Sequence, residues 1–290
     1  MNENIFIRPT TLADREAIEH LCVGSPWTMQ HFSLSELGTI LSQRPGVARC
    51  DSLTQRVQSF LIATSLVPPC VWLGGFGITW QDHNEAESIC HELLLAWLPL
   101  CKSHGATTAY YSGYDVDNDW MRPMLQLEGF VETALLRSYD KVDFSYPTQG
   151  NDAITIRDMV PSQDIPALVA IEKAAFAPLW QHDQREFFEL AAEYEFFVVA
   201  VNNEGRVVGY QFSTVDSGIG YLVRIAVDPA EHSQGIGSRL MIAAVKFFER
   251  QQVMRILLNT EESNHHAHRL YEWFGFERVE PHGFVMERSL

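Results

Sequence analysis

Hydrophobic and polar positions in the second half of the chain follow a strand, turn and helix order. An apolar run over 221–227 ends at Asp228-Pro229, and the turn His232–Ser238 follows directly. Apolar residues then recur at helical spacing up to Arg250. The pattern predicts a strand over 221–227, a glycine turn, and a helix over 238–250. Glycines allow close backbone approach, and the unpaired N–H groups at a helix start bind phosphate.

A second pattern follows, with a predicted strand over 255–259 and then a capped helix. Asn264 is suited to cap the start of this helix and Gly275 to cap its end. Asn264, Ala267 and Tyr271 share one helix face by their spacing. This face presents an amide, a small residue and a phenol, across which an extended ligand can lie.

Together the two patterns resemble the GNAT superfamily of acyl-CoA-dependent N-acetyltransferases. The turn beginning at His232 matches the family's pyrophosphate loop, Gln/Arg-x-x-Gly-x-Gly/Ala, apart from the histidine itself. The helix matches the signature Asn-x-x-Ala-x-x-Leu-Tyr-x-x-x-Gly-Phe, and the resemblance covers 154–290. It implies transfer of an acetyl group from acetyl-CoA, as co-substrate, to a primary amine on a small molecule or a peptide N-terminus. His232 is expected to weaken phosphate binding without excluding it.

The resemblance also implies where acetyl-CoA binds. The pantetheine arm is expected to add to the strand as an extra strand, with the Val227 N–H polarising the acetyl carbonyl. Asn264 is expected to contact the arm, to cap its helix, or both. The implied cofactor-binding residues are Ile225, Ala226, Val227, His232, Gln234, Gly235, Ile236, Gly237, Ser238, Asn264, Ala267 and Tyr271.

Tyr271 is the candidate catalytic acid, because a phenol is protonated at neutral pH and can donate to a leaving thiolate. The alternative is a core aromatic residue. A base is less evident, since Arg224 and Asn259 occupy the positions where relatives carry one. Glu261 and Glu262 are the candidates, acting directly or through a water, although each also fits a solvated loop carboxylate.

The acceptor is expected near Phe176 and Trp180, which can form an apolar wall or simply pack between helices. A metal site is suggested by three histidines close in sequence, His265, His266 and His268. Neighbouring residues diverge on a helix, however, so we expect no metal.

The two halves of the chain begin alike. Ile5-Phe6-Ile7-Arg8 precedes Asp14, and Ile154-Thr155-Ile156-Arg157 precedes Asp164. They also end alike, because 118–130 aligns without gaps on 264–276. Duplication explains both similarities. The expected fold class is α/β, with two tandem GNAT-like domains, each a mixed, mostly antiparallel central sheet flanked by helices. We expect a degenerate domain over 1–146 and a catalytic domain over 151–290.

The first copy has lost the expected chemistry. The glycine turn is replaced by Gln81-Asp82-His83-Asn84-Glu85, Leu125 stands at the tyrosine position, and Pro123 is expected to shorten or bend the helix. The glycines at 74, 75 and 77 are expected to mark a strand bulge or bend. This half is therefore predicted to be a scaffold that helps to shape the acceptor cleft and binds no acetyl-CoA.

Composition limits the alternatives. The 290 residues are 46% hydrophobic and 20% charged, as in a globular protein, and no run of about 18 apolar residues predicts a membrane span. A net charge of −16 argues against nucleic-acid binding. The five cysteines contain no Cys-x-x-Cys, which fits free thiols in a cytoplasmic monomer or homodimer. A non-catalytic acyl-CoA-binding regulator and a longer-chain acyltransferase remain open.

Overall fold

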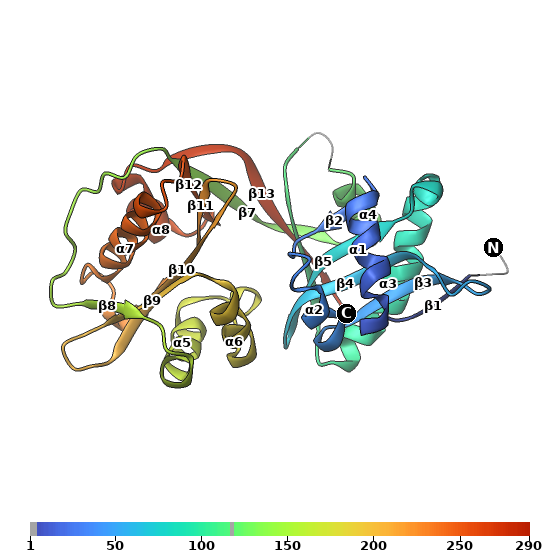
Figure 1. The fold of residues 1–290 in the computed structure, drawn as a ribbon, viewed down its shortest axis with the longest axis horizontal. Helices are drawn as coiled ribbons and strands as arrows, with labels where there is room; N and C mark the ends of the chain where they lie inside the picture. Colours follow the sequence, from blue (N-terminus) through green and yellow to red (C-terminus); the bar gives the residue numbers. More distant parts are fainter. Residues whose placement is uncertain (1–4, 117–118) are drawn as a thin grey trace. The chain divides into compact units, whose positions relative to one another are not determined.

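The computed structural model describes residues 5–116 and 119–290, which form two compact units (Figure 1). Unit 1 consists of Met1–Thr133 and Phe284–Leu290, and unit 2 of Ala134–Gly283. The chain therefore passes from unit 1 to unit 2 at residue 134, before residue 146, where the first domain was expected to end. The reason is strand β7 (Val131–Lys141), whose second part pairs with strand β12 (Arg255–Glu261) of unit 2. A cut at residue 150 would remove a strand from unit 2.

Unit 1 contains helices on both sides of a run of consecutive strands in the chain. Its helical segments are η1 (Leu12–Asp14), α1 (Arg15–Gly24), α2 (Leu37–Gln43), η2 (Trp80–Glu85), α3 (Ala86–Ser103) and α4 (Met121–Leu127). Its strands are β1 (Ile5–Pro9), β2 (Thr28–Gln30), β3 (Gly46–Asp51), β4 (Val57–Val67), β5 (Cys70–Ile78) and β6 (Thr108–Tyr114). The strand order is β1-β3-β4-β5-β6, and β5 and β6 are parallel while the other pairs of this order are antiparallel.

The glycines of β5 are explained by close packing and a bulge. The register with β4 skips Gly74, since Ile62 pairs with Gly75 and Ala63 with Leu73. A Cβ on Gly74 would lie 2.2 Å from Thr64, so only glycine fits. The predicted bulge is confirmed.

Unit 2 repeats the order of helices and strands along unit 1, apart from β2. Its helical segments are α5 (Pro161–Ala175), η3 (Pro178–Trp180), α6 (Gln184–Glu193), η4 (Pro229–Glu231), α7 (Ile236–Arg250) and α8 (His265–Trp273). Its strands, with β7 and β12, are β8 (Thr155–Asp158), β9 (Phe196–Val201), β10 (Val207–Asp216), β11 (Ile219–Val227) and β13 (Glu277–Ser289). The order is β7-β12-β11-β10-β9-β8, with only β11 and β12 parallel. The first part of β13 belongs to unit 2 and its last residues belong to unit 1.

Two layers of helices cover the sheet of unit 2. Along β9, Val199 packs in the core formed with α5 and α6, whereas Val198 and Ala200 pack with Ile236 and Leu240 of α7. This alternation is the period of two expected of a strand buried on both faces. The expected fold, a mixed and mostly antiparallel sheet flanked by helices, is confirmed in both units.

The matching starts of the two halves have the same structural cause. Arg8 forms two hydrogen bonds with Asp14, of 2.8 and 2.6 Å, and Arg157 forms two with Asp164, both of 2.7 Å. Each aspartate also accepts a backbone N–H at the turn before its helix, which is Thr11 in unit 1 and Val160 in unit 2. Both aspartates are buried, and the guanidinium contact holds each pKa below its usual value against the opposing effect of burial.

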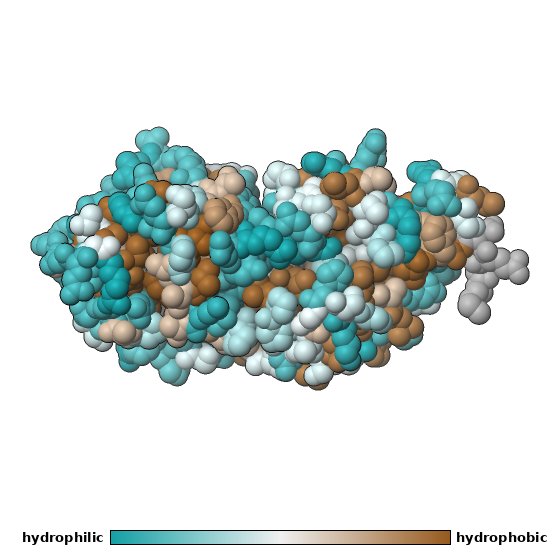
Figure 2. Space-filling view, turned by 90° about the horizontal axis from the view of Figure 1, so that it is seen from below, coloured by the Kyte–Doolittle hydropathy of each residue, from teal (hydrophilic) through white to brown (hydrophobic). Residues whose placement is uncertain are grey.

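The surfaces of both units mix hydrophilic and hydrophobic residues on the face that Figure 2 shows. In the described ranges, no helix is long and apolar enough to cross a membrane. All five cysteines are free thiols, with Cys50, Cys70, Cys90 and Cys101 buried.

Candidate active site

Strands β11 and β12 separate after a short parallel contact. They pair at Ile219–Tyr221, and the register of β11 with β10 then skips Val223, because Leu222 pairs with Ser213 and Arg224 with Phe212. This bulge turns β11 away from its parallel neighbour. Beyond Tyr221, no strand of the described chain pairs with that edge of β11. The backbone of 225–227 is thus available to an extended ligand, and binding of the pantetheine arm there stays a prediction.

The glycine turn leads from this edge to the start of α7. Ser233 and Gly235 have φ of 64° and 75°, and Gly235 is the N-cap residue. The helix begins at Ile236, two residues before the predicted start, because the left-handed Gly235 already completes the turn. The first N–H groups of α7 have no partner within the helix, which makes this end suitable for an anion.

Neighbouring segments fix the turn. The Asn151 side chain donates a 2.8 Å hydrogen bond to the Gln234 carbonyl, so the start of the expected catalytic domain supports the turn. Two acidic side chains lie close by, Asp228 and Glu231, and Arg206 pairs with both. The single positive charge of Arg206 offsets one of these two negative charges, which reduces but does not remove their repulsion of a phosphate.

His232 connects the turn to β11. Its Nε2 lies 3.3 Å from the Val227 carbonyl, which can only accept, so the ring donates there. The ring centroids of His232 and His266 lie 5.9 Å apart. In this conformation His232 orders the turn through its Nε2.

Helix α8 carries the predicted caps. The Asn264 side chain accepts a 3.2 Å hydrogen bond from the Ala267 N–H and donates to the Thr260 hydroxyl at 3.1 Å. Gly275 follows the helix with φ of 79°. The capping role of Asn264 is confirmed, and its contact with a ligand stays a prediction.

The Tyr271 ring is buried in the core between β12, α7 and α8, with 5% of the residue exposed. Its hydroxyl forms no hydrogen bond with any described residue. Burial raises the pKa of Tyr271 above its usual value, while the nearby charge of Arg224 acts in the opposite direction. The phenol is therefore protonated at neutral pH and able to donate.

Arg224 belongs to a buried cluster that the sequence pattern does not reveal. Its guanidinium forms hydrogen bonds of 3.1 and 2.6 Å with Glu172, a residue of α5 with 0% exposure. Tyr210 donates to the same carboxylate, as does the His182 N–H at 3.0 Å. A glutamate at this helical position looks like a solvent-facing residue in sequence. Only the fold shows that it compensates Arg224.

This cluster organises the predicted acceptor wall. The Arg224 guanidinium lies 3.7 Å from the centroid of the Phe176 ring and donates to the Trp180 carbonyl. Phe176 and Trp180 thus lie beside β11, where the strand has separated from β12. Whether they contact an acceptor stays a prediction.

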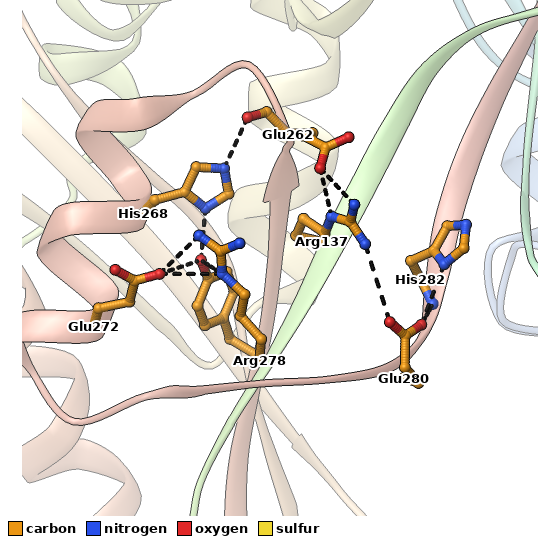
Figure 3. Close-up of polar contacts among 8 residues, drawn as sticks. Arg137, Glu262, His268, Glu272, Arg278, Glu280 and His282 are labelled. Carbon is orange, nitrogen blue, oxygen red and sulfur yellow. Dashed lines mark hydrogen bonds and ion pairs between the residues drawn. The ribbon is translucent and has the colours of Figure 1, made fainter.

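The two candidate bases have different surroundings. Glu262 forms an ion pair with Arg137 of β7, and Arg137 also lies 4.0 Å from Glu280 (Figure 3). The hydrogen bond from Arg137 lowers the pKa of Glu262, which makes this carboxylate a weaker base. Glu261, at the end of β12, forms no side-chain hydrogen bond within the described residues. Of the two, Glu261 is better suited to accept a proton.

A polar network around the buried Tyr139 and His268 holds α8 in place (Figure 3). His268 lies 3.0 Å from the Glu262 carbonyl through Nε2 and 2.6 Å from the Tyr139 hydroxyl through Nδ1. Glu272 and Arg278 contact the same hydroxyl at 3.3 and 3.1 Å. His268 is therefore a buried residue that joins α8 to β7. In the described parts of the chain, no group of three or more His, Cys, Asp or Glu side chains is arranged to hold a metal.

The corresponding region of unit 1 differs in four features. The short helix η2 replaces the glycine turn, and Leu125 is fully buried at the tyrosine position. Helix α4 begins at Met121, two aligned residues later than α8, with Pro123 in its first turn. Asn118, the predicted cap, lies outside the described residues.

The fourth difference is β2. This strand pairs antiparallel with Gly75–Gly77 of β5, and hydrogen bonds from His31 to Gly74 and from Ile78 to Trp27 extend the contact. Because β4 occupies one edge of β5, β2 occupies the edge next to β6. That edge corresponds to the unpaired edge of β11.

Comparison with known proteins agrees with this geometry. Residues 165–276 match the acetyltransferase (GNAT) family. This part of the chain belongs to the GNAT family. The matched range contains the separated strands, the glycine turn and α8.

Among curated relatives, the GNAT domain resembles two mycothiol acetyltransferases. One is from Saccharomonospora viridis, 28% identical and covering 44% of this chain and 47% of the relative. The other is from an Arthrobacter species, 29% identical and covering 44% and 43%. The chain thus spans about half the length of the curated relatives it matches.

Solved structures extend the likeness to both units. A tandem GNAT protein from the clavulanic acid biosynthesis pathway has a TM-score of 0.69 at 13% identity, covering 98% of each chain. A GCN5-related N-acetyltransferase from Sphaerobacter thermophilus has a TM-score of 0.63 at 17% identity, covering 100% of this chain and 96% of that chain. At these identities the likeness shows the fold, which is that of tandem GNAT domains.

Proposed function

We propose that the chain is an N-acetyltransferase that moves an acetyl group from acetyl-CoA to a primary amine in unit 2. The observation that carries the proposal is the unpaired edge of β11, which leads into the glycine turn at the start of α7. An extended pantetheine arm would pair with 225–227, and the pyrophosphate would lie at the first N–H groups of α7. No metal is required.

The residues of unit 2 supply the steps that transfer needs. The Val227 N–H would polarise the acetyl carbonyl at the end of the arm. Tyr271 would donate its proton to the leaving thiolate, since its hydroxyl is protonated and free of other described partners. Glu261 would accept a proton from the amine, directly or through a water, because Arg137 already holds Glu262.

The acceptor would approach along Phe176 and Trp180, whose positions depend on Arg224. The names of the relatives favour a small, mycothiol-related amine over a peptide N-terminus. The free, largely buried cysteines fit a cytoplasmic protein.

An amine panel tests the proposal. Thiol release from acetyl-CoA is measured with mycothiol-related amines, polyamines, aminoglycosides, amino acids and peptides. We expect release that depends on at least one amine and stays at background without it. Acetyl-CoA binding with no release for any amine would favour the alternative, a non-catalytic acyl-CoA-binding regulator. Faster thiol release from longer acyl-CoA donors would indicate that the protein transfers a longer acyl group than acetyl.

Unit 1 is proposed to be a scaffold without a nucleotide site. Strand β2 already pairs with the β5 edge that a pantetheine arm would need, and Asp82 and Glu85 lie where a pyrophosphate would bind. Unit 1 thus keeps its buried core but lacks both features of a nucleotide site, as expected of a domain with a structural role.

We therefore expect one acetyl-CoA per full-length chain. Calorimetric titration measures this stoichiometry directly, and a value near two would contradict the scaffold proposal. The Gly237→Glu variant distinguishes a site in unit 2 from one in unit 1. If this variant still binds acetyl-CoA at full affinity, that binding must occur outside the turn before α7.

A further inference from the structure

The segment that follows α1 in unit 1 takes a different course from the segment that follows α5 in unit 2. In unit 1 this segment forms β2 on the edge of β5, and the Ile78 N–H donates to the Trp27 carbonyl at 3.1 Å. In unit 2 it forms η3, and the Trp180 carbonyl accepts a hydrogen bond from the Arg224 guanidinium. A tryptophan carbonyl thus pairs with the strand edge in unit 1 and with an arginine side chain in unit 2.

Sheet register identifies the position in unit 1 that corresponds to Arg224. Arg224 lies three residues after Tyr221, the last residue paired with β12, and opposite the last residue of β10 before the bulge. Gly75 occupies the same position of β5 with respect to β6 and β4. A Cβ on Gly75 would lie 2.6 Å from Ile62 and 2.9 Å from Phe32, so unit 1 has no room there for an arginine.

The two side chains that bind Arg224 together with its carboxylate partner are also replaced in unit 1. Eight residues after the arginine-paired aspartate of each unit stand Glu172 and Cys22. By strand register, Tyr210 corresponds to Phe60. Cys22 and Phe60 belong to the apolar cluster around α1. The whole polar cluster of unit 2 is therefore absent from unit 1.

Unit 1 shows that the fold itself does not require the ion pair. Burying two charges costs free energy that their attraction repays only in part, and apolar side chains often pack as stably. Unit 1 forms the same arrangement with apolar residues at these positions. In unit 2 the completely buried Glu172 binds two nitrogens of Arg224, at 3.1 and 2.6 Å, which fixes the guanidinium. The fixed guanidinium in turn contacts the Trp180 carbonyl and the Phe176 ring.

The N–H group that this arrangement leaves unpaired belongs to Val227. The next residue, Asp228, donates its N–H to the Val208 carbonyl of β10 at 2.9 Å. Successive N–H groups of a strand point to opposite edges, so the Val227 N–H points away from β10. Val227 corresponds by register to Ile78, whose N–H is bound by the Trp27 carbonyl in unit 1.

We propose that Glu172 and Arg224 are positioning residues that hold the segment 176–181 away from the edge of β11 and so keep this edge free for an acyl-CoA. Arg224 occupies the Trp180 carbonyl, which would otherwise pair with the strand as the Trp27 carbonyl does. The inference rests on the proposed function in one respect, the binding of the pantetheine arm at 225–227. The separation of the segment from the strand is measurable without any ligand.

The test replaces the ion pair by neutral side chains of similar size, Glu172→Gln with Arg224→Met, in the full-length protein. Changing both together leaves no uncompensated buried charge. Hydrogen–deuterium exchange of the Val227 amide is followed by NMR without ligand. We expect exchange to slow at least about tenfold, because the Trp180 carbonyl loses its guanidinium donor and accepts from the Val227 N–H. Acetyl-CoA affinity, measured by calorimetric titration, should fall at least about tenfold.

The matched control is Arg157→Met with Asp164→Asn, which removes a doubly hydrogen-bonded ion pair that both units keep. In the folded control the Val227 amide should exchange as in the wild type. Unchanged Val227 exchange in the double variant of Glu172 and Arg224, or equal slowing in the control, would overturn the proposal.

A conservative variant covers the case in which the double variant does not fold. Arg224→Lys keeps a positive charge beside Glu172 but lacks the planar fork that reaches both the carboxylate and the Trp180 carbonyl. It should slow Val227 exchange at least about threefold, and wild-type exchange in this variant would overturn the proposal. A wild-type protein that binds no acetyl-CoA would contradict the proposed function alone, because the exchange comparison would still decide the positioning role. Slower exchange with full acetyl-CoA affinity would confirm the positioning role and refute binding of the arm at this edge.

Discussion

Replacing Gly237 with glutamate is expected to weaken acetyl-CoA binding by about 100-fold or more, about 2.8 kcal/mol, while the protein stays folded. Gly237 is the second residue of α7, in the turn where the first N–H groups of the helix are unpaired. A carboxylate there would compete with a phosphate for the same N–H groups and repel it. Calorimetric titration measures the affinity, and circular dichroism checks the fold.

The geometry at Gly237 makes this position a better probe than its neighbour. A Cβ on Gly237 would lie 3.5 Å from Leu270 and 3.8 Å from Val227, which are ordinary contacts. Gly235 has φ of 75°, so any side chain there would strain the turn whatever its charge.

Two control variants separate charge from bulk. Gly237→Ala should keep nearly full affinity, and Gly237→Gln should lose less than Gly237→Glu because it adds similar volume without charge. A folded Gly237→Glu variant that binds acetyl-CoA as tightly as the wild type would show that this turn is not the phosphate site.

Local patterns in the sequence predicted much of this structure. The glycine turn and the Gly275 cap depend on left-handed backbone conformations that few residue types adopt, and the Asn264 cap depends on a short side chain that accepts a backbone N–H, so residue identity reveals them. The Arg and Asp residues that recur at the start of each half could also be recognised from residue identity. A doubly hydrogen-bonded pair needs the arginine at the end of the strand and the aspartate near the first turn of the helix, six or seven residues later.

The sequence pattern could not predict contacts between residues that are far apart in the chain. Glu172 and Arg224 are 52 residues apart, and neither residue type suggests burial. Strand β2 has only three residues, too few to show an alternating pattern, and it forms because the edge of β5 is available to it. The placement of 134–141 in unit 2 likewise depends on pairing with β12, which no local signal marks.

Changing Tyr271 to phenylalanine is expected to lower kcat by about 100-fold, the lower end of what a positioned general acid contributes. The substitution keeps the buried ring and removes only the hydroxyl, which has no described hydrogen-bond partner to lose. Acetyl-CoA affinity should therefore change little. Because the phenol acts on the leaving thiolate, kcat and kcat/KM should fall together. Steady-state thiol release measures both once an accepted amine is known.

A second tyrosine in the same core provides the control. Tyr146 packs against the cluster that contains Tyr271, and its ring faces Lys246 at 5.5 Å. Tyr146→Phe removes a hydroxyl of the same kind and should leave kcat within about twofold, a change of about 0.4 kcal/mol in the barrier. If Tyr271→Phe turned over as fast as the wild type, the phenol would be only a core residue. If it lost acetyl-CoA affinity instead of kcat, the hydroxyl would serve binding rather than proton transfer. Only a loss confined to turnover, absent from the Tyr146 control, identifies Tyr271 as the acid.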